Sequence, residues 1–151
     1  MKKHSTIYVS IFIMGLLFLS KLSFAGADDI MGIWYNDDKS AKVEIFKNGI
    51  KYYGRIIWLK EPLNEEGKEK IDKNNPDASK RSAKVMMLVI LRNLVYDADD
   101  KNYQDGDIYD PKNGKDYSCK LTLLDYNNLD LRGFVGLPAF GRTSKWVRTT
   151  K

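Results

Sequence analysis

Short stretches of alternating apolar and polar residues run along this chain from Gly32 to Arg148, and turn-forming residues separate them. An alternation with a period of two is typical of β-strands that bury one face. The pattern predicts about eight strands, at residues 32–35, 41–46, 50–59, 84–96, 107–109, 116–124, 129–135 and 143–148. We therefore expect an all-β domain with antiparallel neighbours, either a barrel or a sandwich.

The strongest hairpin signal is Asn48-Gly49. Both central residues of the turn type that favours Asn-Gly need a positive φ, which these two residues tolerate. A turn centred there places Ile45 opposite Tyr52, and the alternation then continues along the second strand in steps of two. The predicted inward face of that strand carries Tyr52, Gly54, Ile56 and Trp58.

Two segments depart from this simple alternation. Residues 60–82 are almost wholly polar and contain two prolines, so they predict a long connection, which in a compact domain is either functional or mobile. Residues 84–96 form a nearly continuous apolar run. A helix would place Val85, Leu88 and Val89 on one face, but the β-branched residues and the turn signals that follow favour a strand.

The N-terminus has the anatomy of a secretory signal peptide. Lys2 and Lys3 precede an apolar run from Ile7 to Leu19, and small residues around Ala25 fit a cleavage site. The apolar run is shorter than the ~20 residues that span a bilayer, so a membrane anchor is the weaker alternative. We expect residues 1–25 to be removed, leaving 26–151 as a single domain in the periplasm or outside the cell, without a stable membrane span.

Removal of this leader changes what the composition implies. The formal charge of +5 loses three lysines, so the working chain is only mildly basic and nucleic-acid binding loses its main support. The only histidine, His4, lies in the leader, and Cys119 is the only cysteine. Within one chain this excludes histidine-dependent catalytic triads, cysteine–histidine dyads and zinc sites built on these residues.

Other candidate sites are weak. The Asp72–Asp77 segment offers oxygen atoms, but it lacks the ligand spacing of a calcium-binding EF-hand and more often forms turns. Asp110–Lys115 lacks the spacing of a phosphate loop. Cys119 shares one face of its strand with Tyr117 and Leu121, which predicts that it points inward as a small apolar side chain. We therefore expect no metal, no cofactor and no catalytic residue.

Motifs along the chain together resemble the exported bacterial domain-of-unknown-function family 2147. The resemblance rests on Gly32-x-Trp34, Asn74-Asn75-Pro76-Asp77, Gly106-x-Ile108-Tyr109-Asp110-Pro111, Gly114-Lys115-x-Tyr117-x-Cys119, Leu131 to Pro138 and Gly141-Arg142-Thr143-x-x-Trp146-x-Arg148. Members of that family usually carry a glycine where this chain reads Met86-Met87-Leu88, and a tryptophan near Tyr103.

The ends of the chain also resemble lipocalins and their calycin relatives. These barrels carry Gly-x-Trp on the first strand and an arginine beyond the last, the positions of Gly32, Trp34 and Arg148. The resemblance implies an up-and-down barrel of about eight strands. It further implies that Arg148 stacks on Trp34 and closes one end, a contact worth ~0.5–2 kcal/mol.

The candidate ligand-binding residues are aromatic or cationic. Four aromatic side chains are expected to face the interior, and two arginines remain near the C-terminus once the closing strand is assigned; the six are Tyr52, Trp58, Tyr109, Tyr117, Arg132 and Arg142. A barrel of this size can hold one small ligand or be filled by its own side chains. In a chain this short, a filled interior is the more common outcome.

Three functions remain open at this stage. The first is a non-enzymatic envelope protein that binds a small apolar or amphipathic ligand. The second is an envelope interaction module that uses a filled barrel as scaffold and residues 60–82 as contact surface. The third is a carboxylate-based hydrolase of envelope polymers, which would need two acidic side chains held together in a cleft. The sequence leaves the ligand and the oligomeric state open.

Overall fold

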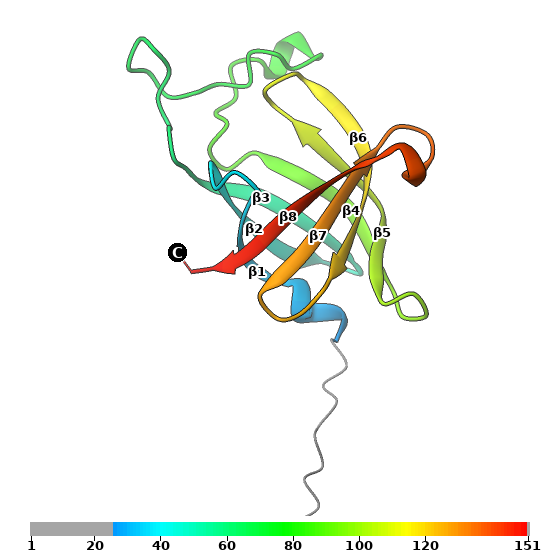
Figure 1. Cartoon of the computed structure of the whole chain (residues 1–151). Helices are drawn as coiled ribbons and strands as arrows, with labels where there is room; N and C mark the ends of the chain where they lie inside the picture. Colours follow the sequence, from blue (N-terminus) through cyan, green and yellow to red (C-terminus); the bar gives the residue numbers. More distant parts are fainter. Residues whose placement is uncertain (1–25, 151) are drawn as a thin grey trace, which may run out of the picture.

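The computed structural model of the protein describes residues 26–150, which form a closed barrel of eight antiparallel strands (Figure 1). The expected leader, residues 1–25, lies outside the described residues. The elements in chain order are η1 (Ala27–Ile30), β1 (Gly32–Tyr35), β2 (Ala41–Asn48), β3 (Lys51–Leu59), η2 (Ala78–Lys80), β4 (Val89–Asp97), β5 (Asn102–Asp110), β6 (Lys115–Leu123), β7 (Asn128–Phe134), η3 (Pro138–Phe140) and β8 (Arg142–Thr149).

Each strand pairs with its neighbours in sequence, and β8 returns to pair with β1 and close the barrel. The prediction of an all-β, antiparallel up-and-down barrel is confirmed. The ambiguous segment 84–96 becomes strand β4 from Val89 onward, so the strand interpretation is correct and the helix alternative is wrong.

The β2–β3 hairpin turns one residue later than the sequence predicts. Asn48 pairs with Lys51, and the two-residue loop is Gly49-Ile50, with Gly49 at φ 62°. Glycine at the first central position suits the other common hairpin turn, in which that residue alone needs a positive φ. Ile45 therefore faces Gly54 and not Tyr52. The inward set is unchanged as far as Ile56, because the pairing moved by an even number of residues.

The predicted inward position of Trp58 is wrong, because β3 contains a bulge. Val43 pairs with Ile56 and Lys42 with Trp58, so Ile57 is an extra residue in the ladder. A bulge of one residue reverses the alternation beyond it. Trp58 therefore lies on the outer surface, edge-on to Tyr35 at 6.0 Å between ring centroids and under the Lys42 ammonium.

The barrel is closed at the end where η1 lies (Figure 1). Trp34 Nε1 donates to the Ile30 carbonyl at 2.9 Å, and the Tyr103 hydroxyl donates to the Ala27 carbonyl at 2.7 Å. The Arg148 guanidinium lies 4.2 Å from the Trp34 ring centroid, where the sequence placed it, and donates to the carbonyls of Met31 and Asp29. This end is therefore filled by side chains and held by buried backbone partners.

Candidate functional site

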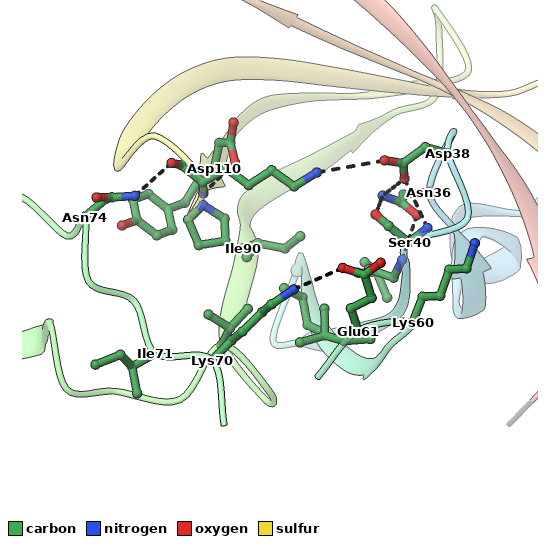
Figure 2. Close-up of a pocket in the computed structure, with 18 of the residues that line it drawn as sticks. Asn36, Asp38, Ser40, Lys60, Glu61, Lys70, Ile71, Asn74, Ile90 and Asp110 are labelled. Carbon is green, nitrogen blue, oxygen red and sulfur yellow. Dashed lines mark hydrogen bonds and ion pairs between the residues drawn. The ribbon is translucent and has the colours of Figure 1, made fainter. Parts of the chain in front are cut away.

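The opposite end of the barrel holds a cavity of about 1140 Å³ (Figure 2). It is surrounded by the β1–β2 connection, the long β3–β4 connection and the β5–β6 turn. The sequence analysis favoured an interior filled by side chains. That expectation holds near η1 but is wrong at this end, where the volume is that of a small-molecule site.

The deep wall of the cavity is apolar. Six strands contribute large apolar side chains to it, among them Val43 from β2, Ile56 from β3, Ile90 from β4, Ile108 from β5, Leu131 from β7 and Trp146 from β8. Five of the six are buried, and Ile108 is half-buried. Five of the six have a polar or charged neighbour on their strand, as the period-two pattern expects, whereas Ile90 lies between Val89 and the buried Leu91.

The mouth of the cavity is polar and carries both signs of charge. Lys112 Nζ of the β5–β6 turn lies 3.8 Å from Asp38 of the β1–β2 connection, and Lys70 Nζ lies 3.7 Å from Glu61 (Figure 2). All four side chains are exposed, so these ion pairs are weak and screened by salt. The mouth is therefore lined by charged side chains whose ion pairs contribute little to holding its connections in place.

A buried hydrogen bond fixes the long β3–β4 connection over one side of the mouth. The Tyr109 hydroxyl donates to Asp72 Oδ1 at 2.7 Å, and Asn75 Nδ2 donates to Asp72 Oδ2 at 2.6 Å. Burial, followed by the bond to Asp72, raises the pKa of Tyr109 to about 12, so the phenol remains a donor at neutral pH. Asn74 also reaches the neighbouring turn, where its Nδ2 donates to the Lys112 carbonyl at 2.8 Å.

The predicted ligand-binding residues occupy different places. Tyr109 lines the cavity. Tyr52 lies in the closed end, where its hydroxyl donates to Asp28 Oδ1 at 2.6 Å, and Trp58 lies outside the barrel. The half-buried Tyr117 accepts a hydrogen bond from Asn113 at 3.1 Å. The structure therefore does not bring these four aromatic side chains together.

Arg132 and Arg142 lie near the β7–β8 connection. Arg132 donates to the carbonyls of Pro138 and Ala139 and to the Thr143 hydroxyl, so it holds the shape of that connection. Arg142 begins β8 and is exposed. Gly32 lies directly beneath Arg148, since a Cβ there would meet Arg148 Nη1 at 2.5 Å. Glycine at this position therefore makes room for the guanidinium that closes the barrel.

Sequence reasoning missed most of the deep wall, including Trp146, Ile90 and Leu131. Alternation shows which face of a strand is inward, but not how far along the barrel axis a residue lies. Leu129 and Leu131 have the same pattern, yet Leu131 lines the cavity and Leu129 fills the core below it. Counting residues from the Trp34–Arg148 pair would have supplied that height, because Trp146 is one inward step from Arg148 toward the mouth.

Metal ligands and a reactive thiol are two kinds of group that could carry chemistry at the cavity. Among residues 26–150 no cluster of three or more potential metal ligands is found. Cys119 is buried and does not line the cavity, and burial raises the pKa of its thiol to about 12, so the reactive thiolate is scarce at neutral pH. In the same part of the chain, no helix has the length and apolar character needed to cross a membrane.

Comparison with known proteins agrees with this geometry. Protein HP1028 from the human pathogen Helicobacter pylori, described as belonging to the lipocalin family, matches over 80% of this chain and 83% of its own, with a TM-score of 0.68 and 24% sequence identity. At that identity the likeness establishes a lipocalin-like fold. A search of curated proteins gives no match. Residues 32–148 match the family described as uncharacterized protein conserved in bacteria (DUF2147), and the chain belongs to this family.

Proposed function

We propose that this protein is an exported, non-enzymatic barrel of the bacterial cell envelope that binds a small apolar or amphipathic ligand in its cavity. The carrying observation is the cavity of about 1140 Å³, walled by large apolar side chains from six strands. Desolvating an apolar ligand against such a wall is favourable at roughly 25 cal/mol per Å² of buried surface.

The contrast between wall and mouth favours an amphipathic ligand. The wall offers aliphatic side chains and Trp146, whereas the mouth offers lysines and carboxylates in weak, exposed pairs. An amphipathic ligand can bury its apolar body against this wall and leave its polar end at the mouth, in contact with solvent. There, a negatively charged end can pair with a lysine and a positively charged end with a carboxylate. The lipocalin-like fold supports this proposal, because barrels of that architecture can enclose one small ligand.

The absence of histidine after residue 4 supports a non-enzymatic role. Hydrogen bonds from the Ser40 side chain and backbone lower the pKa of Asp38 at the mouth below its ordinary value, which favours the carboxylate over a proton-donating acid.

The test is ligand-dependent stability of the delipidated protein. The probes are 1-anilinonaphthalene-8-sulfonate, long-chain fatty acids and lysophospholipids. A probe at about 100 times its dissociation constant should add roughly 2.7 kcal/mol of stability, which raises the melting temperature by about 10 °C. Trp146 lines the cavity while Trp34 lies in the closed end and Trp58 outside, so binding should also change the emission of Trp146.

A pair of variants locates the binding. Ile108→Trp places a large ring inside the cavity and should abolish the stabilisation, whereas Val89→Trp adds the same ring on the outer, exposed side of β4 and should leave it intact. Circular dichroism checks that both variants fold. If no probe stabilises the wild type, or if both variants bind equally well, the cavity is not a ligand site.

Export needs a separate experiment. The proposal expects the protein recovered from the periplasm or the medium to begin near Gly26, as N-terminal sequencing would show. A chain that keeps Met1 and remains in the cytoplasm would contradict export, whatever the cavity binds.

A further inference from the structure

The β7–β8 connection, residues 135–141, presents apolar side chains to solvent. Val135 is 73% exposed, Leu137 63% and Phe140 82%. Single exposed apolar residues are common on protein surfaces, but three on one seven-residue connection form a concentrated apolar tip. Such features mark interaction sites.

This tip is held in shape by the rest of the barrel. Arg132 Nε donates to the Pro138 carbonyl at 2.6 Å, Nη2 donates to the Ala139 carbonyl at 3.2 Å, and Nη1 donates to the Thr143 hydroxyl at 2.9 Å. Gly141 packs so closely that a Cβ there would meet the Gly133 carbonyl oxygen at 2.7 Å. The outward direction of the apolar side chains is therefore built into the fold.

The tip lies at the open end of the barrel. In an up-and-down barrel, alternate connections share one end, so the β7–β8 connection lies with the β1–β2, β3–β4 and β5–β6 connections that surround the cavity. Figure 1 shows the β7–β8 connection, with η3, far from η1 at the closed end. A surface that binds the tip would therefore meet the same end of the molecule as the mouth.

The charges next to the tip are positive. Arg132 and Arg142 flank it, and Lys120 of β6 pairs directly with Arg132 in the sheet. From Leu131 to Lys151 the sequence contains five lysines and arginines and no aspartate or glutamate. Asp130, just before this stretch, lies 3.5 Å from Lys145. The surroundings of the tip thus complement an anionic partner.

We propose that residues 135–141 dock this protein on an anionic lipid surface. Leu137, Phe140 and Val135 enter the boundary between head groups and acyl chains, and Arg142 contacts the head groups. Three apolar side chains on one convex connection are too few for a standard protein interface of about 1,600 Å². A few apolar side chains next to basic ones suffice for reversible binding at a membrane surface.

The test is flotation of the full mature protein with vesicles of phosphatidylcholine alone or with phosphatidylglycerol added. The wild type should float with the anionic vesicles and be released by high salt. Leu137→Ser/Phe140→Ser should weaken partitioning by roughly tenfold or more, since it removes two inserted side chains. Arg142→Gln should weaken binding to anionic vesicles about fivefold and leave binding to neutral vesicles unchanged.

The matched control is Ile50→Ser. Ile50 is 78% exposed and lies in the β2–β3 turn, at the closed end of the barrel. The Ile50→Ser variant loses a comparable exposed apolar side chain and should float with the vesicles as the wild type does. Unchanged melting temperatures show that all variants are folded.

Two outcomes overturn the proposal. In one, the double variant floats as strongly as the wild type. In the other, the wild type does not bind vesicles of either composition. A pull-down that recovers a protein partner only when Leu137 and Phe140 are intact would then show that the tip is a protein-binding site. The assay needs no ligand in the cavity, so its result is independent of the proposed ligand binding.

Discussion

Met87 adopts a backbone conformation that its side chain disfavours. Its φ is 70°, in the left-handed region, and it lies just before β4, where Met87 N donates to the Ile56 carbonyl at 2.7 Å. Non-glycine residues pay about 1–2 kcal/mol for this conformation. A residue without a Cβ would adopt this conformation more readily.

Met87→Gly should therefore stabilise the protein. Met87 is exposed, so the substitution loses little buried apolar surface. We expect a gain of about 1 kcal/mol, which corresponds to a rise of roughly 3–5 °C in melting temperature. Met86→Gly is the matched control, because Met86 packs on the core and its loss should destabilise. A Met87→Gly protein that melts below the wild type would contradict the backbone argument.

The residue scale also shows where pattern reasoning fails. The inward set of β2 and β3 was predictable up to Ile56, because alternation holds even when the turn moves by one residue. Trp58 was not predictable, since a bulge at Ile57 leaves no mark in a run of apolar residues. The local sequence Arg55-Ile56-Ile57-Trp58 is compatible with either face.

At the scale of elements, the β3–β4 connection depends on one buried pair. Asp72 is the buried carboxylate of the connection, and Tyr109 is its donor from β5. The polar composition of this segment predicted a long connection that is either functional or mobile. The hydrogen bond from Tyr109 and isolated β-bridges, such as the one between Ile71 and Lys84, hold it in place. Tyr109 is thus a cavity-lining residue that also positions the cavity's edge.

Tyr109→Phe should loosen this connection. The change leaves Asp72 buried with one donor fewer, which costs about 1–3 kcal/mol. Hydrogen exchange should increase for the amides of residues 70–76, measured by mass spectrometry, while the core strands remain protected. Tyr117→Phe is the control, because the Tyr117 oxygen only accepts from the exposed Asn113 side chain. Equal exchange in the two variants would show that Asp72 does not hold the connection.

The η1 element should respond to acid through Asp28. Hydrogen bonds from Lys47 and then Tyr52 lower the pKa of Asp28 below its ordinary value of 3.8. A carboxylate with a lowered pKa stabilises the fold fully above the unfolded value and loses that effect as the pH falls through the folded value.

Asp28→Asn should therefore be less stable than the wild type at pH 7, and the difference should shrink as the pH falls below 3.8. Urea unfolding between pH 3 and 7 measures this. Asp37→Asn, an exposed position in the β1–β2 connection, is the comparison. A stability difference that does not vary with pH would mean that Asp28 acts through shape and not through its charge.

For the whole molecule, the sequence was sufficient for the barrel and its closure, but not for the cavity. Antiparallel pairing follows from alternation and turns, whereas the up-and-down barrel and the Trp34–Arg148 contact follow from the resemblance of the chain's ends to lipocalins. The division into a filled half and a hollow half depends on how side chains stack along the barrel axis. Tyr52, for example, lies in the closed end, whereas Tyr109 lines the cavity. That division is a property of three-dimensional packing.

The pairing of β1 with β8 differs from the other strand pairs in the length of chain that it closes. Every other strand pair joins neighbours in sequence, whereas this pair closes a loop of roughly 115 residues at a chain-entropy cost on the order of 4 kcal/mol. All eight strands can therefore form as successive hairpins while β1 and β8 keep unpaired edges that invite aggregation. Pairing of β8 with β1, which brings Arg148 over Trp34, removes both edges in one step and so protects the barrel from edge-to-edge aggregation.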